Sequence, residues 1–369
     1  MPAEPEITAP VDLCLPSGRL NPEAVGWTRN PLHRTNLRGW GRSKRWEYWC
    51  VQTADWALGI TISHIDYLAL HQVYFVDFTS REEIDEAAIV PLARGPQLAE
   101  HSGGVARART KKLSIDLIPN TRGLRLVART ERVDADIQID RPDGHESMGV
   151  VIPWNDKQFQ YTVKENTLPA SGSLRVDGRD LPLPEGQTWA VLDHGRGRWP
   201  YSTIWNWGSG SGQSGDHVIG LQFGGKWTEG TGMTENALCI DGRVSKISQE
   251  LEWTYDQWLE PWTIRGDELD DEDEVRAARS DRSVLLTVGL AFFLAELGDK
   301  TMLATITLAT KNGLFGTWLG STLGMVAADA LAIVVGQQLG ARLPERTVKV
   351  GAAITFVVFG VLLIVEGIR

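Results

Sequence analysis

The chain has 369 residues and a formal net charge of −10. At about 150 residues per domain, this length suggests two or three domains. The acidic balance argues against nucleic acid as a partner, because proteins that bind phosphate backbones need a basic surface. Three scattered cysteines, Cys14, Cys50 and Cys239, lack metal or redox spacing, so we expect neither a disulfide framework nor a zinc site.

The charge is divided unevenly along the chain. Residues 283–369 contain five acidic and six basic residues, a net charge of +1, which leaves −11 for residues 1–282. The first twelve residues, MPAEPEITAPVD, have neither the basic start nor the apolar core of a secretory signal. We therefore expect residues 1–12 to form a flexible tail and the soluble part of the chain to stay in the cytoplasm.

Residues 13–266 have the pattern of an all-β domain. Short apolar runs are separated by turn sequences such as Pro142-Asp143-Gly144, Asp177-Gly178 and Asp241-Gly242. The runs are Trp56 to Ile62, Val73 to Phe78, Leu124 to Ala128, Ala135 to Ile139, Val218 to Phe223 and Ala237 to Ile240. Many short strands with glycine-rich turns predict a sandwich or a barrel.

Fourteen of the fifteen tryptophans fall in this region, most densely between Thr188 and Gly212. Trp205 and Trp207 alternate, so on a strand they would face the same way. Asp193 and His194 precede them on a glycine-rich bend. Aromatic walls with a few polar groups are typical of a small-molecule pocket, and an Asp-His pair can transfer protons. The alternative is a tryptophan-packed barrel in which these residues are purely structural.

Several short motifs in residues 13–267 resemble a bacterial domain family of unknown function. They are Trp40-Gly41, His71 with Val76-Asp77-Phe78, Asp193-His194-Gly195-Arg196-Gly197, Trp205-Asn206-Trp207 and Thr234-Glu235-Asn236. The strand-rich pattern is similar to lipocalin-like proteins that include hydroxyneurosporene synthase and tocopherol cyclase. The resemblance implies an apolar or lipidic ligand and no particular reaction. Members of the family continue with further strands where this chain becomes acidic, which leaves open whether the barrel is complete.

Residues 267–282 read as an acidic linker and juxtamembrane segment. Seven of the eight residues from Asp267 to Glu274 are acidic, which predicts a solvated spacer. Three apolar segments follow, at about 283–310, 314–339 and 348–367, each long enough to cross a bilayer as a helix. Gly320 and Gly324 form a G-x-x-x-G pair that allows close helix contact.

A charged sequence, Glu296-Leu297-Gly298-Asp299-Lys300, interrupts the first apolar segment. Charges near mid-membrane cost at least ~2.5 kcal/mol each on insertion scales, so they usually serve ions or protons. On a helix Glu296 and Asp299 share a face, and Lys300 can partly neutralise Glu296. With Thr301 nearby, the two carboxylates form a hard-oxygen site suited to a divalent cation. The alternative is a buried ion pair that fixes helix packing.

Asp329 is another charge within an apolar segment, so its insertion into a membrane is costly for the same reason. It either completes the ion site or pairs with Lys300. Six basic residues flank the segments on the side of the β domain, and two flank them on the other side. This bias places the β domain in the cytoplasm. On the side of the β domain the basic residues are Arg276, Arg279, Arg282, Arg342, Arg346 and Lys349, and on the other side they are Lys311 and Arg369.

Residues 283–369, with Ala295-Glu296-Leu297-Gly298-Asp299-Lys300-Thr301, resemble one repeat of the cation-transporter family with the E-x-G-D-[KR]-[ST] motif. That family includes Golgi and thylakoid calcium/manganese antiporters and bacterial manganese exporters. The resemblance implies that Glu296 and Asp299 are ligands of a transported Mn²⁺ or Ca²⁺, with no permanently bound cofactor. It also implies a second repeat, because the family usually carries two inverted copies.

The second repeat would come from a homodimer or from another three-helix protein. Our first hypothesis is thus a multi-pass carrier of the bacterial inner membrane that exchanges Mn²⁺ or Ca²⁺ for H⁺, and not an enzyme. The second hypothesis is a membrane-tethered lipocalin-like domain that binds or modifies an apolar ligand. The third is a truncated or chimeric product in which neither half works.

Overall fold

The computed structural model describes residues 4–255 and 262–266, and these residues form β-strands with one short 3-10 helix, Pro22–Ala24. The predictions for residues 267–369, including the linker, the three membrane helices and Asp329, lie outside the described residues. Among the residues that are described, no helix has the length and apolar character needed to cross a membrane.

Most strands belong to one large sheet with the order β7-β6-β5-β4-β16-β14-β12-β11-β10-β9-β8, on which β2, β13 and β15 also pair. The long strands on one side of this order are Ser43–Gln52 (β4), Trp56–His64 (β5), Leu68–Asp77 (β6) and Glu83–Pro91 (β7). The strands on the other side are Gln97–Leu98 (β8), Ala106–Arg109 (β9), Ser114–Asn120 (β10), Gly123–Arg129 (β11) and Val133–Asp140 (β12). The central strands are Phe159–Val176 (β14) and Trp189–Arg198 (β16), and the short additions are Trp27–Thr28 (β2), Met148–Pro153 (β13) and Arg179–Leu181 (β15).

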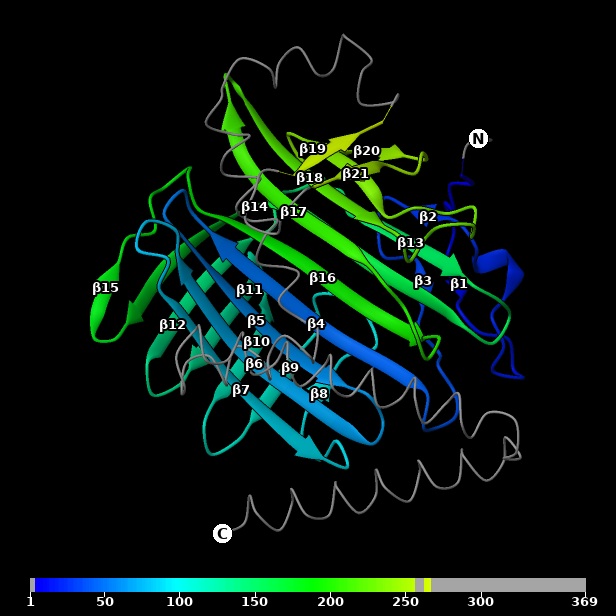
Figure 1. Ribbon diagram of the computed structural model, residues 1–369, viewed down its shortest axis with the longest axis horizontal. Coiled ribbons are helices and arrows are strands. Elements are labelled where there is room, and N and C mark those ends of the chain that lie inside the picture. The colour runs from blue at the N-terminus through cyan, green and yellow to red at the C-terminus, as the bar shows by residue number, and fades with distance from the viewer. Residues whose placement is uncertain (1–3, 256–261, 267–369) are drawn as a thin grey trace, which may run out of the picture. The chain divides into compact units, whose positions relative to one another are not determined.

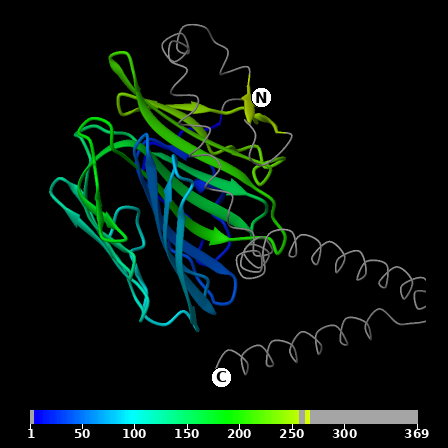
Figure 2. The ribbon, with the colours of Figure 1, turned by 60° about the vertical axis from the view of Figure 1, so that its left-hand side comes forward.

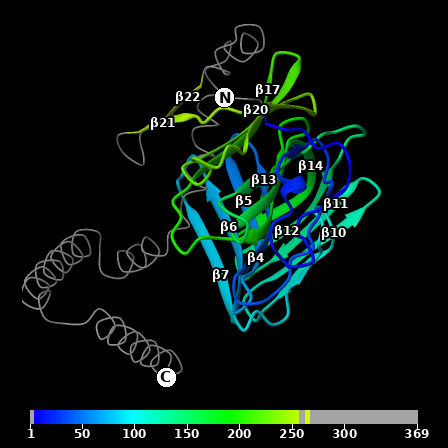
Figure 3. The ribbon, with the colours of Figure 1, turned by 90° about the vertical axis from the view of Figure 1, so that its right-hand side faces the viewer.

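This sheet curls so that β4–β7 and β9–β12 face one another as two walls (Figures 1 and 3). The largest apolar core lies between them, and Trp49, Leu58 and Ile60 contribute to it from one wall and Leu117 and Ile137 from the other. The strands β8 and β9 come close to β4 and β5. In the described part of the chain the hydrogen-bonded order starts at β7 and ends at β8, so the sheet forms a half-barrel.

We call the face that bears this core the inner face and the opposite one the outer face. Strand alternation assigns side chains to each, since successive residues point to opposite sides. Expected strands at 56–62, 73–78, 124–128 and 135–139 are confirmed as parts of β5, β6, β11 and β12. The all-β prediction for this region is therefore confirmed.

A second sheet, β17-β18-β19-β20, contains Asn206–Ser214 (β17), His217–Gly225 (β18), Asn236–Ile240 (β19) and Arg243–Ile247 (β20) (Figure 2). It packs on the outer face of β13 through an apolar cluster that includes Val150, Ile152, Trp227 and Met233. Burying both faces of β13 explains why its sequence, MGVVIP, is almost continuously apolar.

Strand β14 connects the two sheets because it changes register in its middle. Its pairing with β16 shifts between Glu165 and Leu168, and Thr167 has a φ of 58°. At this bulge the Asn166 side chain donates to Ser209 Oγ at 2.5 Å and to the Leu221 carbonyl at 2.9 Å, on the second sheet. The irregularity thus turns a buried amide toward β17 and β18.

Two expected turns are confirmed as tight hairpin turns. Asp177 and Gly178 have φ of 48° and 76°, and Asp241 and Gly242 have φ of 50° and 79°. Both residues of a type I′ turn need positive φ, which asparagine, aspartate and glycine tolerate best. These two Asp-Gly pairs connect β14 to β15 and β19 to β20.

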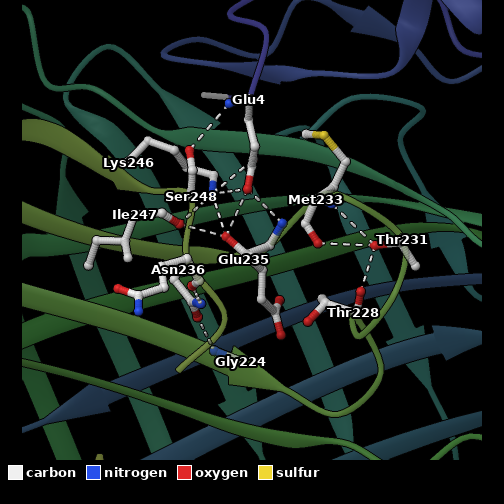
Figure 4. A network of polar contacts seen from close by, with 12 residues as sticks. Glu4, Gly224, Thr228, Thr231, Met233, Glu235, Asn236, Lys246, Ile247 and Ser248 are labelled. Carbon is white, nitrogen blue, oxygen red and sulfur yellow. Dashed lines mark hydrogen bonds and ion pairs between the residues drawn. The ribbon is translucent and has the colours of Figure 1, made fainter. Parts of the chain in front are cut away.

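The structure corrects the expectation of a flexible tail for residues 4–12. The Glu4 carboxylate is buried and accepts hydrogen bonds from the Thr234 backbone at 2.8 Å and from Lys246 Nζ at 3.0 Å (Figure 4). Val11–Asp12 (β1) pairs in parallel with His33–Arg34 (β3). A buried carboxylate needs hydrogen-bond partners, and here the Lys246 ammonium group also supplies the opposite charge. Two short strands, Glu252–Thr254 (β21) and Thr263–Arg265 (β22), pair at the other end of the described region.

Candidate functional site

Strand β16 carries both Asp193 and His194, and it points them in opposite directions. The structure has a continuous strand from Trp189 to Arg198 where the sequence suggested a bend. Asp193 pairs across the outer face with Tyr48, whereas His194 pairs across the inner face with Glu47. The two residues therefore belong to two different clusters and do not form an Asp-His pair.

The outer cluster is a buried group of charges between the two sheets. Lys164 Nζ of β14 lies 2.8 Å from Asp193 Oδ1 and 3.1 Å from Glu235 Oε2. Glu235 precedes β19, and its Oε1 accepts a hydrogen bond from Trp227 Nε1 at 2.6 Å. Lys164 and Glu235 have side chains only 4% and 2% exposed. Two carboxylates and one ammonium leave this buried group with an excess of negative charge when all three are ionised.

The pKa shifts of this cluster follow from burial and charge. Burial raises the pKa of Glu235, and Lys164 opposes that effect only in part. Burial pushes the pKa of Lys164 down, but Asp193 and Glu235 outweigh it, so the net shift is upward. The lysine therefore stays charged, and Glu235 is the group of the cluster that takes up a proton more readily than usual.

Trp207 and Trp205 contact different partners. Lys164 Nζ lies 4.7 Å from the centroid of the Trp207 ring, and Tyr48 meets that ring edge-on at 6.0 Å. Trp205 lies just before β17, and its ring meets Trp199 at 5.9 Å. Trp207 thus joins the outer charged cluster, whereas Trp205 joins a group of indoles around Trp199.

This indole group has Trp199 at its centre. Its ring stacks on Trp227 at 5.6 Å with an interplanar angle of 7°. It also meets three other indoles edge-on or nearly so, namely those of Trp46, Trp154 and Trp205. The Trp199 Nε1 group donates to Gln160 Oε1 at 2.7 Å, which fixes the orientation of the ring. The expected aromatic wall is therefore present, but it packs mostly on itself.

The inner cluster is built around His194. Its Nδ1 lies 2.5 Å from Glu47 Oε1, and both side chains are almost fully buried. Arg196 Nη2 lies 3.3 Å from the same Glu47 oxygen, and its Nη1 donates to the Trp46 and Gly195 carbonyls at 2.8 Å. Arg196 also donates to the carbonyl of Ala99, which follows β8. The guanidinium thereby ties β4, β16 and the segment after β8 together.

Polar atoms without partners gather on this same inner face. Within residues 4–255 and 262–266, five buried atoms here have no hydrogen-bond partner from the protein. They are Glu47 Oε2, Trp49 Nε1, His71 Nδ1, Tyr161 Oη and His194 Nε2. The strand register places three of these residues in one row, because His71 pairs with Ile62, Ile62 with Glu47, and Glu47 with His194. An unsatisfied buried polar group costs about 1–3 kcal/mol, so a polar group that bonded to these atoms would be stabilised.

The inner cluster has the arrangement of an oriented base. Glu47 accepts the Nδ1 proton of His194, which leaves Nε2 as an acceptor. Burial lowers the pKa of His194, so the imidazole is neutral and able to accept a proton. Burial also lowers the pKa of Arg196. Burial also lowers the pKa of His71, and a hydrogen bond with the backbone of Leu70 opposes this effect only in part.

Sequence reasoning missed four of the residues that define these clusters: Lys164, Glu235, Glu47 and His71. Glu235 and His71 were part of quoted motifs, but nothing in a single sequence says which distant carboxylate meets which base. Glu47 lies in the alternating run SKRWEYWCVQ, where its polar character at an inward position between Arg45 and Trp49 was a usable signal.

The expected metal site cannot be placed. Glu296, Asp299 and Asp329, with Lys300 and Thr301, all lie outside the described residues. Within the part of the chain that is described, no three His, Cys, Asp or Glu side chains are grouped so as to hold a metal ion.

Comparison with known families divides the chain in two. Residues 4–276 match the model of a domain of unknown function, DUF2804, and the chain belongs to that family. Residues 284–369 match the model of the divalent cation/proton antiporter GDT1. These assignments confirm both resemblances inferred from the sequence.

The curated relatives match only the carboxyl-terminal part. GDT1-like protein 3 of Arabidopsis thaliana is 39% identical over 69 residues, 19% of this chain and 24% of that protein. A putative manganese exporter of Vibrio cholerae is 31% identical over 90 residues, 24% of this chain and 43% of that protein. The chain therefore spans between about a quarter and a half of the length of these relatives.

Similar solved structures are distant. A putative AttH from Nitrosomonas europaea shares 13% identity with a TM-score of 0.38, covering 55% of this chain and 67% of that chain. Kievitone hydratase from Nectria haematococca shares 12% identity with a TM-score of 0.36, covering 61% and 72%. At these TM-scores no property of either protein is transferred to this chain.

Proposed function

We propose that residues 283–369 form half of a divalent cation/proton antiporter, and that Mn²⁺ is the ion carried. The observation that carries the proposal is the match of residues 284–369 to the GDT1 family, which includes the sequence from Glu296 to Thr301. The Vibrio cholerae relative, a putative manganese exporter, favours Mn²⁺ over Ca²⁺.

In this proposal Glu296 and Asp299 bind the cation and release it when they are protonated. Carboxylates suit exchange because a proton and a hard cation compete for the same oxygens. Asp329, Lys300 and Thr301 support the site. The chain would be a multi-pass protein of the bacterial inner membrane, with its β domain in the cytoplasm, as the excess of basic residues on that side favours.

One repeat supplies too few oxygen ligands for six-coordinate metal, so the proposal includes a second repeat. A homodimer would have to be antiparallel and would put one acidic β domain on each side of the membrane, against the charge bias. A separate three-helix protein avoids this conflict, and both arrangements can be distinguished by whether the purified chain alone transports.

The test is Mn²⁺ flux into proteoliposomes that hold the purified chain, with a pH gradient imposed. Glu296→Gln should reduce the flux at least ~10-fold, since even outer-shell partners of metal sites are worth about 10–100-fold. Glu345→Gln, outside the motif, is the matched control and should transport normally. Flux that survives in Glu296→Gln would contradict the proposal, whereas no flux in any correctly inserted variant would point to a separate partner.

A second function, for the β domain, is favoured by the unpartnered Nε2 of His194. We infer that this lipocalin-like half-barrel binds, on its inner face, an apolar ligand with one polar group, and that His194 meets that group. The oriented Glu47–His194 pair at 2.5 Å and the apolar core beside it support this inference. The same pair would allow the domain to act as an enzyme on such a ligand.

The probe for this function is cis-parinaric acid, a fluorescent polyene fatty acid. Energy transfer from the tryptophans to the bound polyene should appear with the wild-type chain and weaken in His194→Asn. His217→Asn, at an exposed histidine on β18 that pairs with Asp241, is the control. Equal transfer in wild type and His194→Asn, with both variants folded, would remove His194 from the site. Transfer lost in Trp207→Ala but kept in His194→Asn would move the site to the outer cluster.

A further inference from the structure

Exposed apolar side chains gather at one end of the half-barrel. Among the described residues, the large hydrophobic side chains that are exposed are Leu15, Trp40, Tyr67, Ile89, Leu92, Tyr201, Ile204 and Trp205. The strand register brings their segments together, because β4 begins opposite the end of β16, and the β5–β6 turn lies beside the end of β7. In Figure 1 the arrowheads of β7 and β16 mark this end. We call these eight residues the aromatic end.

Hydrogen bonds fix the loop of the aromatic end that carries Trp40. Trp40 is 74% exposed and lies between Gly39 and Gly41, whose φ values are 88° and 94°. A residue with a side chain rarely adopts such angles, so the two glycines allow the turn that presents the indole. The Asp66 carboxylate accepts hydrogen bonds from the backbone of Gly41 and Ser43 at 2.7 Å and 2.9 Å. The exposed indole is thus preorganised rather than collapsed onto the domain.

Neighbouring loops are also tied to each other by polar contacts. The Leu92 backbone donates to the Tyr67 carbonyl at 2.7 Å. Arg198 Nη1 donates to the Gly18 carbonyl at 2.8 Å, which connects the end of β16 to the loop that follows Leu15. These bonds connect loops of the aromatic end that are distant in sequence.

Basic side chains surround these apolar groups. Arg42 donates to the Trp199 carbonyl at 3.1 Å, and its guanidinium lies 4.2 Å above the Tyr201 ring. Arg38 donates to the Pro16 carbonyl at 3.3 Å, and Arg94 is exposed two residues after Leu92. Within residues 4–255 and 262–266, none of Arg38, Arg42 and Arg94 forms an ion pair with a carboxylate.

Arginines elsewhere on the domain are bound differently. On β11 and the turn before β12, Arg125 pairs with Asp136 at 2.5 Å and Arg132 with Asp177 at 2.7 Å. Residues 1–282 carry a net charge of −11, so a basic end runs against the composition of the domain. Arginines without a carboxylate partner and exposed aromatic rings thus occur together at this end.

We propose that the aromatic end docks the β domain onto the surface of a bilayer that contains anionic lipids. Exposed aromatic rings are stable at the level of the lipid headgroups, where the ring is shielded and its polar edge stays wet. Each arginine near an anionic membrane surface adds about 1 kcal/mol of attraction. The combination of aromatic and basic side chains fits a lipid surface better than an apolar protein groove.

The position of the chain's apolar segments supports this occupant, and in this respect the inference rests on the proposed function. Sixteen residues, 267–282, separate Gly266 from the first apolar segment, and an extended chain covers at most ~3.6 Å per residue. If residues 283–369 are in a bilayer, the domain stays within roughly 60 Å of it. A tethered surface needs little intrinsic affinity, because its effective concentration is high.

The test places a fluorophore on Trp40→Cys in the full-length chain, reconstituted in nanodiscs of phosphatidylcholine with or without phosphatidylglycerol. Glu185→Cys, in the exposed turn before β16 and so at the opposite end, is the matched control. The wild-type chain, labelled in parallel, corrects for the three natural cysteines. Lipids with a headgroup spin label should quench the fluorophore at position 40 several times more than the one at 185, and acrylamide should show the reverse.

The charges are tested separately. Arg42→Glu with Arg94→Glu should abolish the difference between positions 40 and 185 in phosphatidylglycerol, whereas Arg129→Glu on β11 should leave it intact. Equal quenching at positions 40 and 185 in the parent chain would overturn the proposal. Shielding of position 40 that persists in detergent without lipid would also overturn it, since a protein contact would then cover this end.

The result of the docking experiment can be separated from that of the transport experiment. Mn²⁺ flux is measured on the same preparations, so lipid contact at position 40 without flux leaves docking intact and removes the antiporter. If the chain does not insert, flotation with phosphatidylglycerol vesicles replaces the nanodiscs. A chain that stays in solution, or that floats with position 40 accessible to acrylamide, overturns docking.

Discussion

At the scale of single residues, Gly195 shows how a missing side chain shapes the domain. An added Cβ at this position would lie 2.1 Å from Trp46 Cζ2, so the indole covers the glycine. Trp46 in turn meets Trp199 at 5.9 Å, at the centre of the indole group. The sequence Asp193 to Gly197 thus contributes charged groups and, at Gly195, a position without a side chain on which the Trp46 ring packs.

Gly195→Ala should destabilise the β domain by about 1–3 kcal/mol, because the methyl group forces Trp46 out of its position. Urea unfolding followed by tryptophan emission measures this, since fourteen of fifteen tryptophans lie in the β domain. Gly212→Ala on β17 is the control, because its added Cβ meets nothing within 4 Å. If both variants unfold alike, the close packing of Trp46 on Gly195 has no energetic consequence.

The residues of the candidate site were only partly predictable. The tryptophan-rich patch and Asp193 with His194 stand out in the sequence, because they are rare residue types gathered in a short segment. Their partners do not stand out. Lys164 and Glu235 are separated from Asp193 by long stretches of chain, and only the pairing of β14 with β16 and the packing of the second sheet bring them together.

At the scale of elements, β14 is the strand that holds the two sheets together. Its first half pairs with β13 and β16, its second half pairs with β12, and the bulge between them turns Asn166 toward the second sheet. Lys164, directly before the bulge, reaches Glu235 ahead of β19. The packing of the second sheet thus involves a buried ion group and the Asn166 hydrogen bonds beside an apolar cluster.

Lys164→Met should cost about 3–5 kcal/mol near neutral pH, because it leaves Glu235 buried without its counter-charge. The loss should shrink on acidification. Burial already raises the pKa of Glu235 in the folded state, and removing Lys164 raises it further. The folded variant then binds a proton that the unfolded chain does not yet bind, so its relative stability rises as the pH falls toward the unfolded value.

Urea unfolding of wild type and Lys164→Met at about pH 8 and about pH 5.5 measures this difference. The double variant Lys164→Met with Glu235→Gln should recover part of the lost stability, since no carboxylate is left unpaired at that position. An equal loss at both pH values, without recovery in the double variant, would mean that Lys164 acts through packing alone.

The strands themselves were well predicted, because alternation and Asp-Gly turns are local signals. Their arrangement was not. The order of the large sheet places β16 between β4 and β14, although more than a hundred residues separate β4 from β16. The inward position of Glu47 opposite His194 follows from that register, and a shift of one residue would reverse it.

At the scale of the whole molecule, two families meet in one chain. A DUF2804 domain comes first, and a segment that matches the GDT1 antiporter family follows. The transport and docking proposals are connected, because a membrane anchor makes weak surface contacts effective. Docking would also hold the inner cluster close to the lipid, since Arg196 and Tyr161 lie two residues from the strand ends at the aromatic end.

Sequence alone determined the all-β character of residues 13–266, the acidic composition of residues 267–274, and the resemblance of residues 283–369 to one cation-transporter repeat, because each depends on local pattern or on a short motif. Only the tertiary structure decided that Asp193 and His194 serve different clusters, that Glu47 and Lys164 are their partners, that Glu4 is buried, and that the exposed aromatic residues share one end. The physical reason is that strand order, register and the curl of the sheet create these contacts between distant residues, and no local sequence pattern encodes them.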